Sequence, residues 1–144
     1  MINELPSPTL TQVLRLHVVL GAPLDLGDAG HGRRLIVPMT GGRFSGPELN
    51  GNLVPEAAAD RQITLSDGTI LGDLRCTLRT DLGHLLQMRS RTVTYGDAPG
   101  ELPIRATTRL EATDRHLRWV NRGVFVSVGS LRGYSAIYET YLVS

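Results

Sequence analysis

The sequence contains no lysine, because all of its 15 basic residues are arginine. These face 14 acidic residues, so the formal net charge is +1. This balance gives no electrostatic reason to expect binding to nucleic acid or to an anionic membrane. GC-rich codon usage replaces lysine with arginine and is the simpler explanation, although arginine also binds carboxylates through paired bonds. We therefore expect neither kind of partner, and we reserve a functional role for arginines on particular strands.

Cysteine is nearly absent as well. The single cysteine, Cys76, excludes an intrachain disulfide framework and a zinc site built from several cysteines. It lies between Leu74 and Leu78 in an alternating run and has no adjacent histidine. This setting favours a small buried hydrophobic residue over a reactive nucleophile.

Long apolar runs are also missing. The first residues, MINELPSPTLTQ, lack both a basic n-region and an apolar core for export, and no run approaches the length needed to span a bilayer. We therefore expect a soluble, cytoplasmic protein. Its 144 residues suit one domain over 1–144, with Met1 to Thr9 as a loose N-terminal tail.

A hydrophobic period of two dominates the chain, whereas helical periodicity is scarce. A short helical turn is plausible only at 55–60, and a polar, glycine-rich loop occupies 21–32. The ranges that predict strands are 11–20, 35–39, 51–54, 62–65, 70–79, 85–95, 104–112, 117–128 and 134–143. About eight to ten short strands at regular spacing indicate an all-β fold, either an antiparallel barrel or a sandwich. A barrel also removes exposed strand edges.

The segment 35–55 is the richest in turn signals. Gly41-Gly42, Gly46-Pro47 and Asn50-Gly51 supply positive φ or a preset turn, so the backbone is expected to bend sharply several times here. In a barrel these bends would shape one rim, and Phe44 would contribute to the wall of a pocket.

Strand alternation divides the remaining residues between two faces. The range 117–128 is apolar on both faces, which implies that one face meets the barrel interior and the other a second layer or a partner subunit. We therefore expect a homodimer.

Three segments carry a resemblance to a known family. The motifs are GGRFSGPELNGNLVP, SDGTILGDLRCTLRTDLGHLLQMRSR and WVNRGVFVSVGSLRGYSAIYETY. They resemble the bacterial family known as domain of unknown function 3237 (DUF3237, UPF0311-like), over roughly 14–143. Its pattern also includes Ala-Asp-Trp-Gln, which falls here on Ala59, Asp60 and Gln62, with Arg61 in place of the tryptophan. The resemblance implies a compact, lipocalin-like β-barrel, often dimeric, with no cofactor, and it implies no reaction.

Polar residues on the strands provide the candidate chemistry. Asp73 and Arg75 share a face and could hold each other or a substrate carboxylate, and Arg89 could join them across the hairpin at 80–83. The alternative is an ion pair on a solvated face. Glu111 lies in LEAT, where the family commonly has Phe-Glu-Thr. If buried, its carboxyl would have a raised pKa suited to proton transfer, but an exposed strand glutamate is an equal alternative.

Aromatic residues near the C-terminus are candidates for substrate binding. Trp119, Asn121 and Phe125 share a face and could form an aromatic wall with an amide, although Trp119 could equally fill the core. Tyr138 is a further pocket candidate, and His17 is the one histidine within a predicted strand. No histidine pair has metal-binding spacing and no Gly-x-Ser-x-Gly motif occurs, so we expect no metal and no serine nucleophile.

These observations predict a small-molecule-binding barrel. The favoured function is a cofactor-independent lyase, isomerase or cyclase acting on a small aromatic or carbonyl-bearing substrate. Glu111 or Asp73 would serve as acid or base, Arg75 and Arg89 would provide charge, and Trp119 would provide shape. A non-catalytic carrier or sensor and a structural dimeric barrel remain alternatives. An enclosed cavity joining Asp73, Arg75 and Glu111 would favour the enzyme, whereas exposure to bulk water would argue against it.

Overall fold

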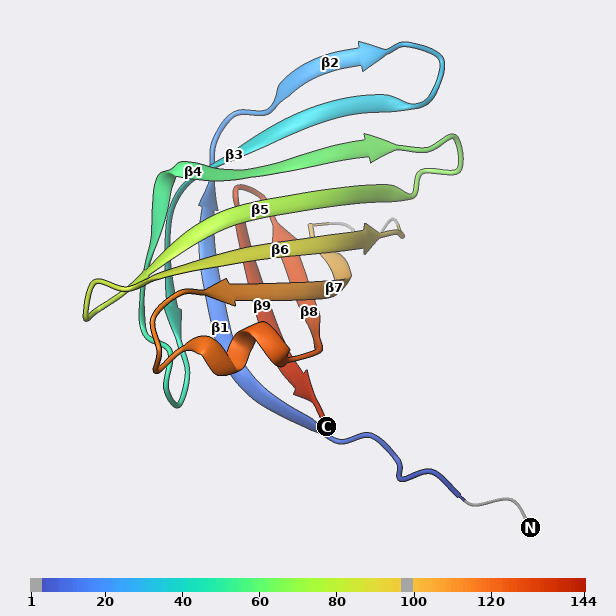
Figure 1. Cartoon of the computed structure of the whole chain (residues 1–144). Coiled ribbons are helices and arrows are strands. Elements are labelled where there is room, and N and C mark those ends of the chain that lie inside the picture. The colour runs from blue at the N-terminus through green and yellow to red at the C-terminus, as the bar shows by residue number, and fades with distance from the viewer. Residues whose placement is uncertain (1–3, 97–99) are drawn as a thin grey trace.

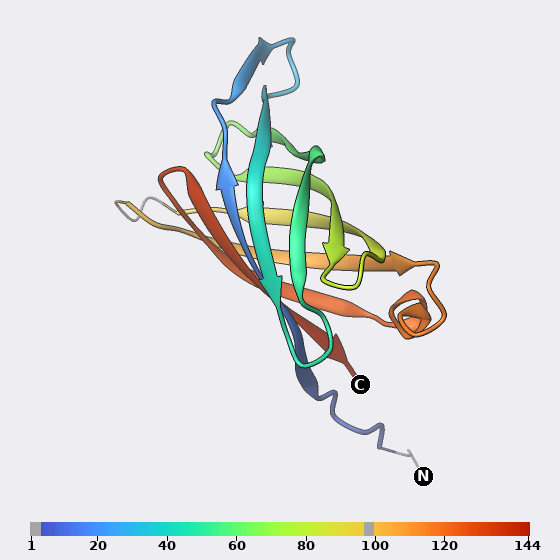
Figure 2. The same cartoon turned by 90° about the vertical axis from the view of Figure 1, so that its left-hand side faces the viewer.

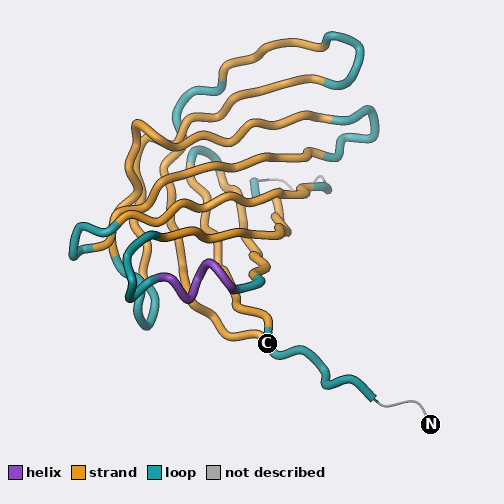
Figure 3. The backbone as a smooth tube through the Cα atoms, in the orientation of Figure 1, coloured by secondary structure: helices purple, strands orange, loops and turns teal. Residues whose placement is uncertain are grey.

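The computed structural model describes residues 4–96 and 100–144. Strands account for most of this length, with one short 3-10 helix (Figure 3). In chain order the elements are β1 Leu10–Leu20, β2 Leu24–Asp28, β3 Arg33–Ser45, β4 Gly51–Thr64, β5 Ile70–Thr80, β6 Leu85–Thr94, β7 Leu102–Ala112, η1 Arg118–Arg122, β8 Phe125–Arg132 and β9 Ser135–Val143. The predicted all-β class is confirmed.

Eight of the nine described strands close into an antiparallel barrel (Figures 1 and 2). The sheet order is β1-β9-β8-β7-β6-β5-β4-β3, and β1 pairs with β3 to complete the ring. The remaining strand, β2, pairs only with the first residues of β3 and extends beyond the barrel wall. The sequence pattern predicts a loop over 21–32 in place of this strand. The alternation is broken here because the register shifts at a bulge between Asp25 and Gly27.

Alternation along each strand separates the core from the surface. On β5, Leu74, Cys76 and Leu78 point inward and are buried, while Asp73 and Arg75 lie on the outer face. Each fully buried leucine stabilises the fold by about 1.5–3 kcal/mol relative to an exposed one. The burial predicted for Cys76 is confirmed, and burial raises the pKa of its thiol to about 12, so it stays protonated and unreactive.

The helical turn predicted at 55–60 is wrong. Strand β4 continues through this segment, with a shift of register between Val54 and Ala58. Alanine favours helix in isolation, but Val54 and Ala58 pair with β5 and Ala59 pairs with β3, so the chain stays extended through the unpaired residues 55–57. This outcome matters for the site, because it places Asp60 on the inward face of β4.

The strand predicted over 117–128 is also wrong in its first half. Residues Arg118–Arg122 form η1, and β8 begins only at Phe125 and runs to Arg132. The Asn121 side chain fixes this turn, because it accepts a hydrogen bond from Ala112 N–H at 2.8 Å and donates one to Ala112 O at 2.9 Å. Leu117 and Val120 are buried beneath η1, which therefore covers one end of the barrel.

The two ends of the barrel differ in closure. At the η1 end, inward residues such as Leu78 and Leu86 are fully buried. At the opposite end, the inward-facing Gln62 and Ile70 are only partly buried, and the short turns at 65–69 and 133–134 border the opening. The inward residues at this second end, which we call the open end, are therefore in contact with solvent.

The residues before β1 are described from Glu4 onward. Residues 4–8 are exposed and have no regular structure, while Met1 to Asn3 lie outside the described residues. Thr9 already belongs to the sheet edge, because its N–H donates to Ser144 O at 2.6 Å and its carbonyl accepts from Ser144 N–H at 2.9 Å. Within the described residues, no helix has the length and hydrophobicity required to cross a membrane.

Candidate functional site

One carboxyl group lies inside the barrel. Asp60 on β4 pairs with Val37 of β3 and Leu74 of β5, and only 6% of its surface is exposed. Its Oδ2 accepts a hydrogen bond from Gln62 Nε2 at 2.9 Å, whereas its Oδ1 is buried without a partner among the described residues. Burial raises the pKa of Asp60, the Gln62 hydrogen bond partly opposes this, and the nearby Asp73 carboxylate adds to the rise.

A glycine on the adjacent strand makes room for this carboxyl group. Gly72 of β5 pairs with Gln62 on one side and Thr92 on the other. A Cβ atom at Gly72 would lie 2.2 Å from Thr92 Oγ1 and 2.8 Å from Asp60 Oδ1. Both oxygens therefore occupy the space that a side chain would fill, and any larger residue would displace them.

Tyr138 faces the same space from β9. It is 3% exposed, and its ring lies over Gly129 of β8, where a Cβ atom would come within 2.9 Å of Tyr138 Cδ1. Burial raises the pKa of its hydroxyl, and negative charge on Asp60 and Cys76 raises it further. The Tyr138 hydroxyl therefore keeps its proton at neutral pH, which makes it a hydrogen-bond donor inside the barrel.

Four hydroxyl groups form a chain around the interior wall. Ser90 and Thr108 are bonded at 2.8 Å, Thr108 and Ser127 at 2.7 Å, and Ser127 and Thr140 at 2.8 Å. All four residues are buried and come from four consecutive strands of the sheet, β6 to β9. Four hydroxyls joined by three bonds hold one more donor hydrogen than the chain itself uses. One hydroxyl hydrogen is therefore left to donate to a group outside this chain of hydroxyls.

Positive charge is kept out of the interior. Every arginine is at least partly exposed, and so is every histidine. Asp60 is the one charged residue in the buried set of the described chain. The interior is thus apolar at the η1 end and carries one carboxyl group with several neutral donors toward the open end.

The predicted cluster of Asp73, Arg75 and Arg89 forms, but on the outer face of the barrel. Arg89 Nε and Nη2 each donate to Asp73 at 3.1 Å, and Arg75 Nη2 lies 3.4 Å from Asp73 Oδ2. The Arg89 guanidinium lowers the pKa of Asp73 more than any other neighbour does. This agrees with the alternative of an ion pair on a solvated face. A catalytic role for these residues stays a prediction, and it loses the enclosed cavity on which it depended.

Glu111 does not reach the interior either. It lies opposite Gln87 on the outer face of β7 and is exposed, while Leu110 and Ala112 point inward. The alternative of an exposed strand glutamate therefore holds. The acid or base role predicted for Glu111 depended on burial among apolar neighbours, which the structure does not show.

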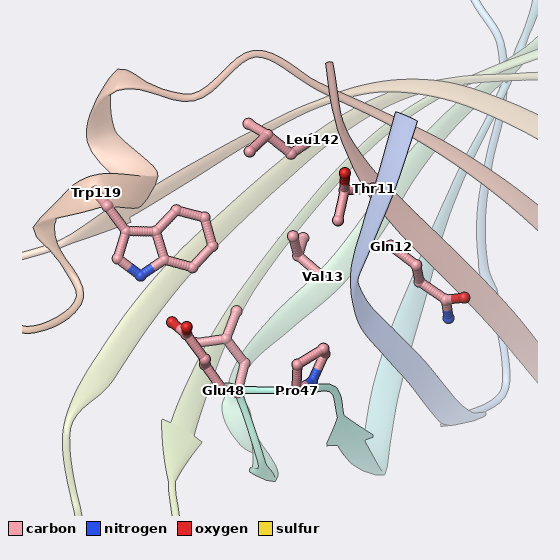
Figure 4. Close-up of a pocket in the computed structure, with 8 residues that line it drawn as sticks. Thr11, Gln12, Val13, Pro47, Glu48, Trp119 and Leu142 are labelled. Atoms are coloured by element: carbon pink, nitrogen blue, oxygen red, sulfur yellow. The ribbon is translucent and has the colours of Figure 1, made fainter. Parts of the chain in front are cut away.

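Trp119 lines a separate pocket at the η1 end (Figure 4). This pocket has a volume of about 380 Å³ and lies between β1, the loop 46–50 and η1, with Val13, Leu49 and Leu142 among its apolar lining. The indole Nε1 is buried without a partner among the described residues. The one ionisable group in this lining, Glu48, is exposed, so the pocket offers shape but no desolvated acid or base.

The other predicted binding residues are dispersed. Phe44 is fully buried in the core, and Phe125 is a core residue whose ring lies 6.4 Å from that of Trp119 at 54°. The Asn121 side chain forms its two hydrogen bonds with the Ala112 backbone. His17 is exposed on the outer face of β1, with Nε2 at 3.5 Å from Ser135 Oγ. Of the predicted binding residues inside the barrel, Tyr138 is the one whose hydroxyl pKa responds to the charge of Asp60.

Asp60 was missed as a site residue although it stands in a family motif. Because a helical turn was predicted at 55–60, Asp60 was not assigned to either face of a strand, and its burial could not be inferred. The available signal was the pair Asp60 and Gln62, two residues apart, leading into a strand. Across residues 4–96 and 100–144, no group of three or more histidine, cysteine, aspartate or glutamate residues is placed to hold a metal ion.

Comparisons with known proteins agree with this fold. A UPF0311 protein of Clostridium acetobutylicum is 24% identical over 157 residues, which covers 99% of each chain. A β-barrel-like protein from Acinetobacter baumannii has a TM-score of 0.91 at 28% identity, covering 98% of this chain and 99% of that one. A structure described as an enzyme from Penicillium herquei has a TM-score of 0.73 at 15% identity, covering 99% of this chain and 100% of that one. At this identity the similarity concerns the fold alone.

The family assignment rests on nearly the whole length of the chain. Residues 8–143 match the family described as "Protein of unknown function (DUF3237)". The resemblance to this family noted in the sequence is thereby confirmed. This chain belongs to the DUF3237 family.

Proposed function

We propose that the chain is a cofactor-independent enzyme that transfers a proton within a small organic molecule bound in the barrel. The observation that carries the proposal is Asp60, a buried carboxyl group of raised pKa with one oxygen that has no partner among the described residues. Retaining such a group costs stability, and functional sites are where costs of this kind concentrate. The reaction class is that of a lyase, isomerase or cyclase.

The arrangement of donors supports a role for Asp60 as acid and base. A carboxylate at Asp60 takes a proton from the carbon next to a substrate carbonyl, and the electron pair of that C–H bond moves toward the carbonyl oxygen. Tyr138 donates a hydrogen bond to this oxygen as it gains charge. The Asp60 carboxyl then returns the proton to another atom of the substrate, which completes an isomerisation without an external reagent. A lyase or cyclase begins with the same proton transfer.

The charge of the interior narrows the substrate class. Asp60 repels anions, and no arginine or histidine of the described chain is buried to offset it. Placing a carboxylate or phosphate in this low-dielectric interior without a cation would be costly. The favoured substrate is therefore an uncharged carbonyl compound with an apolar or aromatic body. The interior of an eight-stranded barrel is either filled by side chains or holds one small ligand, and the unpartnered oxygen of Asp60 favours the second.

The main alternative is a carrier or sensor that holds the same molecule without changing it. A barrel with a purely structural role is the other. The described enzyme from Penicillium herquei supports catalysis on this fold only by analogy, because it is 15% identical. Ligand-induced thermal stabilisation is expected for both an enzyme and a carrier, but turnover is expected only for an enzyme.

The test uses a neutral ketone, 1-indanone, in D2O. The rate of exchange of its α-hydrogens for deuterium, followed by NMR, reports proton transfer directly. The wild type should accelerate exchange, and Asp60→Asn should lose about 10²–10⁴-fold of that acceleration. Glu111→Gln is the matched control, because it makes the same carboxyl-to-amide change on the outer face. Equal rates for Asp60→Asn and the wild type would refute the role of Asp60.

Binding measurements separate the remaining outcomes. If 1-indanone raises the melting temperature of the wild type but hydrogen exchange of the ketone is not accelerated, the protein binds this ketone as a carrier would. If neither stabilisation nor exchange occurs with a panel of neutral cyclic ketones, the proposed substrate class is wrong. A melting temperature of Asp60→Asn that is no lower than that of the wild type will show that any loss of rate is not a loss of fold.

A further inference from the structure

Three arginines stand directly side by side on the outer face of the barrel. In the ladder of β5, β6 and β7, Arg75 pairs with Arg89 and Arg89 pairs with Arg109. These strands run next to one another across the molecule (Figure 1). Adjacent strands are about 4.8 Å apart, so the three side chains leave the sheet as a row of closely spaced positive charges. Like charges directly opposite one another destabilise a sheet.

Two more arginines extend this row on the same face. Arg91 of β6 faces outward two residues beyond Arg89, and Arg105 of β7 is paired with Val93, two residues further along β6. We call Arg75, Arg89, Arg91, Arg105 and Arg109 the arginine face. All alternate with inward-facing core residues on their strands, so the sheet itself holds them on one side.

Acidic residues offset only part of this charge. Asp73 bonds Arg89 and lies near Arg75, and Glu111 is the other acidic residue at an outward position on these strands. Five guanidinium groups against two carboxylates leave an excess of three positive charges, whereas the whole chain carries +1. Within the part of the chain that the structure describes, Arg91, Arg105 and Arg109 have no acidic group within 4.0 Å.

The arginine face borders a shallow groove. This groove has a volume of about 500 Å³ and is lined by Arg91, Arg105, Asp73 and Thr107, with Leu71 and Val93 as apolar neighbours. Its size falls within the range of small-ligand sites. Guanidinium groups bind phosphate and carboxylate through paired hydrogen bonds, and Thr107 adds a hydroxyl group.

We propose that the arginine face binds a compact ligand carrying two or more phosphate or carboxylate groups. Such a ligand brings negative charge to Arg91, Arg105 and Arg109, relieves the repulsion along the row, and leaves the Asp73 to Arg89 pair intact. The site lies on the opposite side of the barrel wall from Asp60, so it is separate from the proposed site of proton transfer.

The extent of the face favours a compact ligand over a nucleic acid. The arginine face covers three strands, which span about 10 Å at the usual spacing. Beside β5, strand β4 contributes the outward Arg61, which lies opposite Asp73. On the next strand, β8, the outward Val126 and Val128 are apolar. A long polyanion would need a charged track that continues beyond these strands, together with a clearly positive chain.

The experiment measures binding of pyrophosphate and of citrate by calorimetry, at about 20 and 200 mM NaCl. We expect saturable binding that weakens with salt, since the contacts are between charges. The double variant Arg91→Gln/Arg109→Gln should bind at least about tenfold more weakly, which corresponds to about 1.4 kcal/mol. Arg34→Gln is the matched control, because Arg34 is an exposed strand arginine outside the arginine face and should leave the affinity unchanged.

Each further outcome decides the proposal. Preference for pyrophosphate identifies phosphate, and preference for citrate identifies carboxylate, as the group that is recognised. Absence of binding by both anions, or an equal loss in Arg34→Gln, would overturn the proposal. A twenty-nucleotide single strand that binds far more tightly than pyrophosphate would also overturn it, in favour of an extended polyanion. Asp60→Asn should bind both anions normally, which separates this site from the barrel interior.

Discussion

The interior carboxyl group makes the stability of the protein depend on pH in a defined direction. Asp60 has a raised pKa in the folded state relative to its ordinary value of 3.8, chiefly because it is buried. The folded protein therefore binds this proton more tightly than the unfolded chain does. Between the unfolded and folded pKa values, the free energy of unfolding must fall as pH rises, and above the folded pKa the loss is complete.

Asp60→Asn removes this dependence with little change in shape. The side-chain oxygen of the introduced amide can still accept the hydrogen bond from Gln62 Nε2, which is 2.9 Å from the carboxylate in the wild type. The amide nitrogen takes the place of the unpaired Oδ1, so the cost of one unsatisfied buried polar group, about 1–3 kcal/mol, stays in both proteins. What disappears is the cost of ionising a carboxyl group inside the barrel.

The size of the gain follows from the pKa. The variant gains about 1.4 kcal/mol over the wild type at neutral pH for each unit by which the folded pKa exceeds the unfolded one. In a domain of this length that amount raises the melting temperature by about 3–6 °C. At pH values below the unfolded pKa the two proteins should differ little, because Asp60 is then protonated in both states.

The assay is thermal unfolding followed by circular dichroism from pH 4 to pH 9. The difference in melting temperature between Asp60→Asn and the wild type should grow with pH and then level off. Glu111→Gln, an exposed carboxyl-to-amide change, should follow the wild type in parallel. A constant difference between Asp60→Asn and the wild type across this range would refute the conclusion that Asp60 ionises at a cost in the folded state.

Three further predictions concern packing, the hydroxyl chain and assembly. Gly72→Ala should destabilise the fold by about 1–3 kcal/mol in chemical denaturation, because the new methyl group overlaps Thr92 and Asp60; unchanged stability would contradict the close contact. Ser127→Ala should cost about 1–3 kcal/mol by the same measurement, since it removes two of the three bonds in the hydroxyl chain, and a neutral effect would show that the chain is replaced by other partners. The protein should be a homodimer by light scattering at micromolar concentration, and a monomeric mass would refute this; Val126→Glu, on the apolar outer face of β8, tests whether that face forms the interface.

Much of the fold could be predicted from local pattern. Alternation along 70–79 places Leu74, Cys76 and Leu78 together, and burial follows because one face of a barrel strand must meet the core. The hairpin at 80–83 pairs Arg89 with Arg75, which places Arg89 diagonally next to Asp73. These inferences hold because each depends on residues close in sequence, where strand geometry leaves few choices.

The errors arose where distant contacts decide the local structure. The alanine-rich segment before Asp60 favours helix by composition, yet pairing of Ala58 with β5 and of Ala59 with β3 draws its end into the sheet. The segment after Leu117 alternates like a strand, yet the Asn121 side chain bonds the end of β7 and turns the chain into η1. In both places long-range hydrogen bonds outweigh intrinsic propensity, which spans only about 1 kcal/mol per residue.

The sequence by itself determined the all-β class, the family and which residues share a strand face. Only the tertiary structure decided which of those faces points inward. A polar strand face can line a ligand site inside a barrel or lie in solvent outside it, and the strand pattern does not distinguish these until the ring closes. Closure of β1 on β3 placed Asp60, Thr92 and Tyr138 inside. The same closure left Asp73, Arg75 and Glu111 outside, where solvent stabilises their charges.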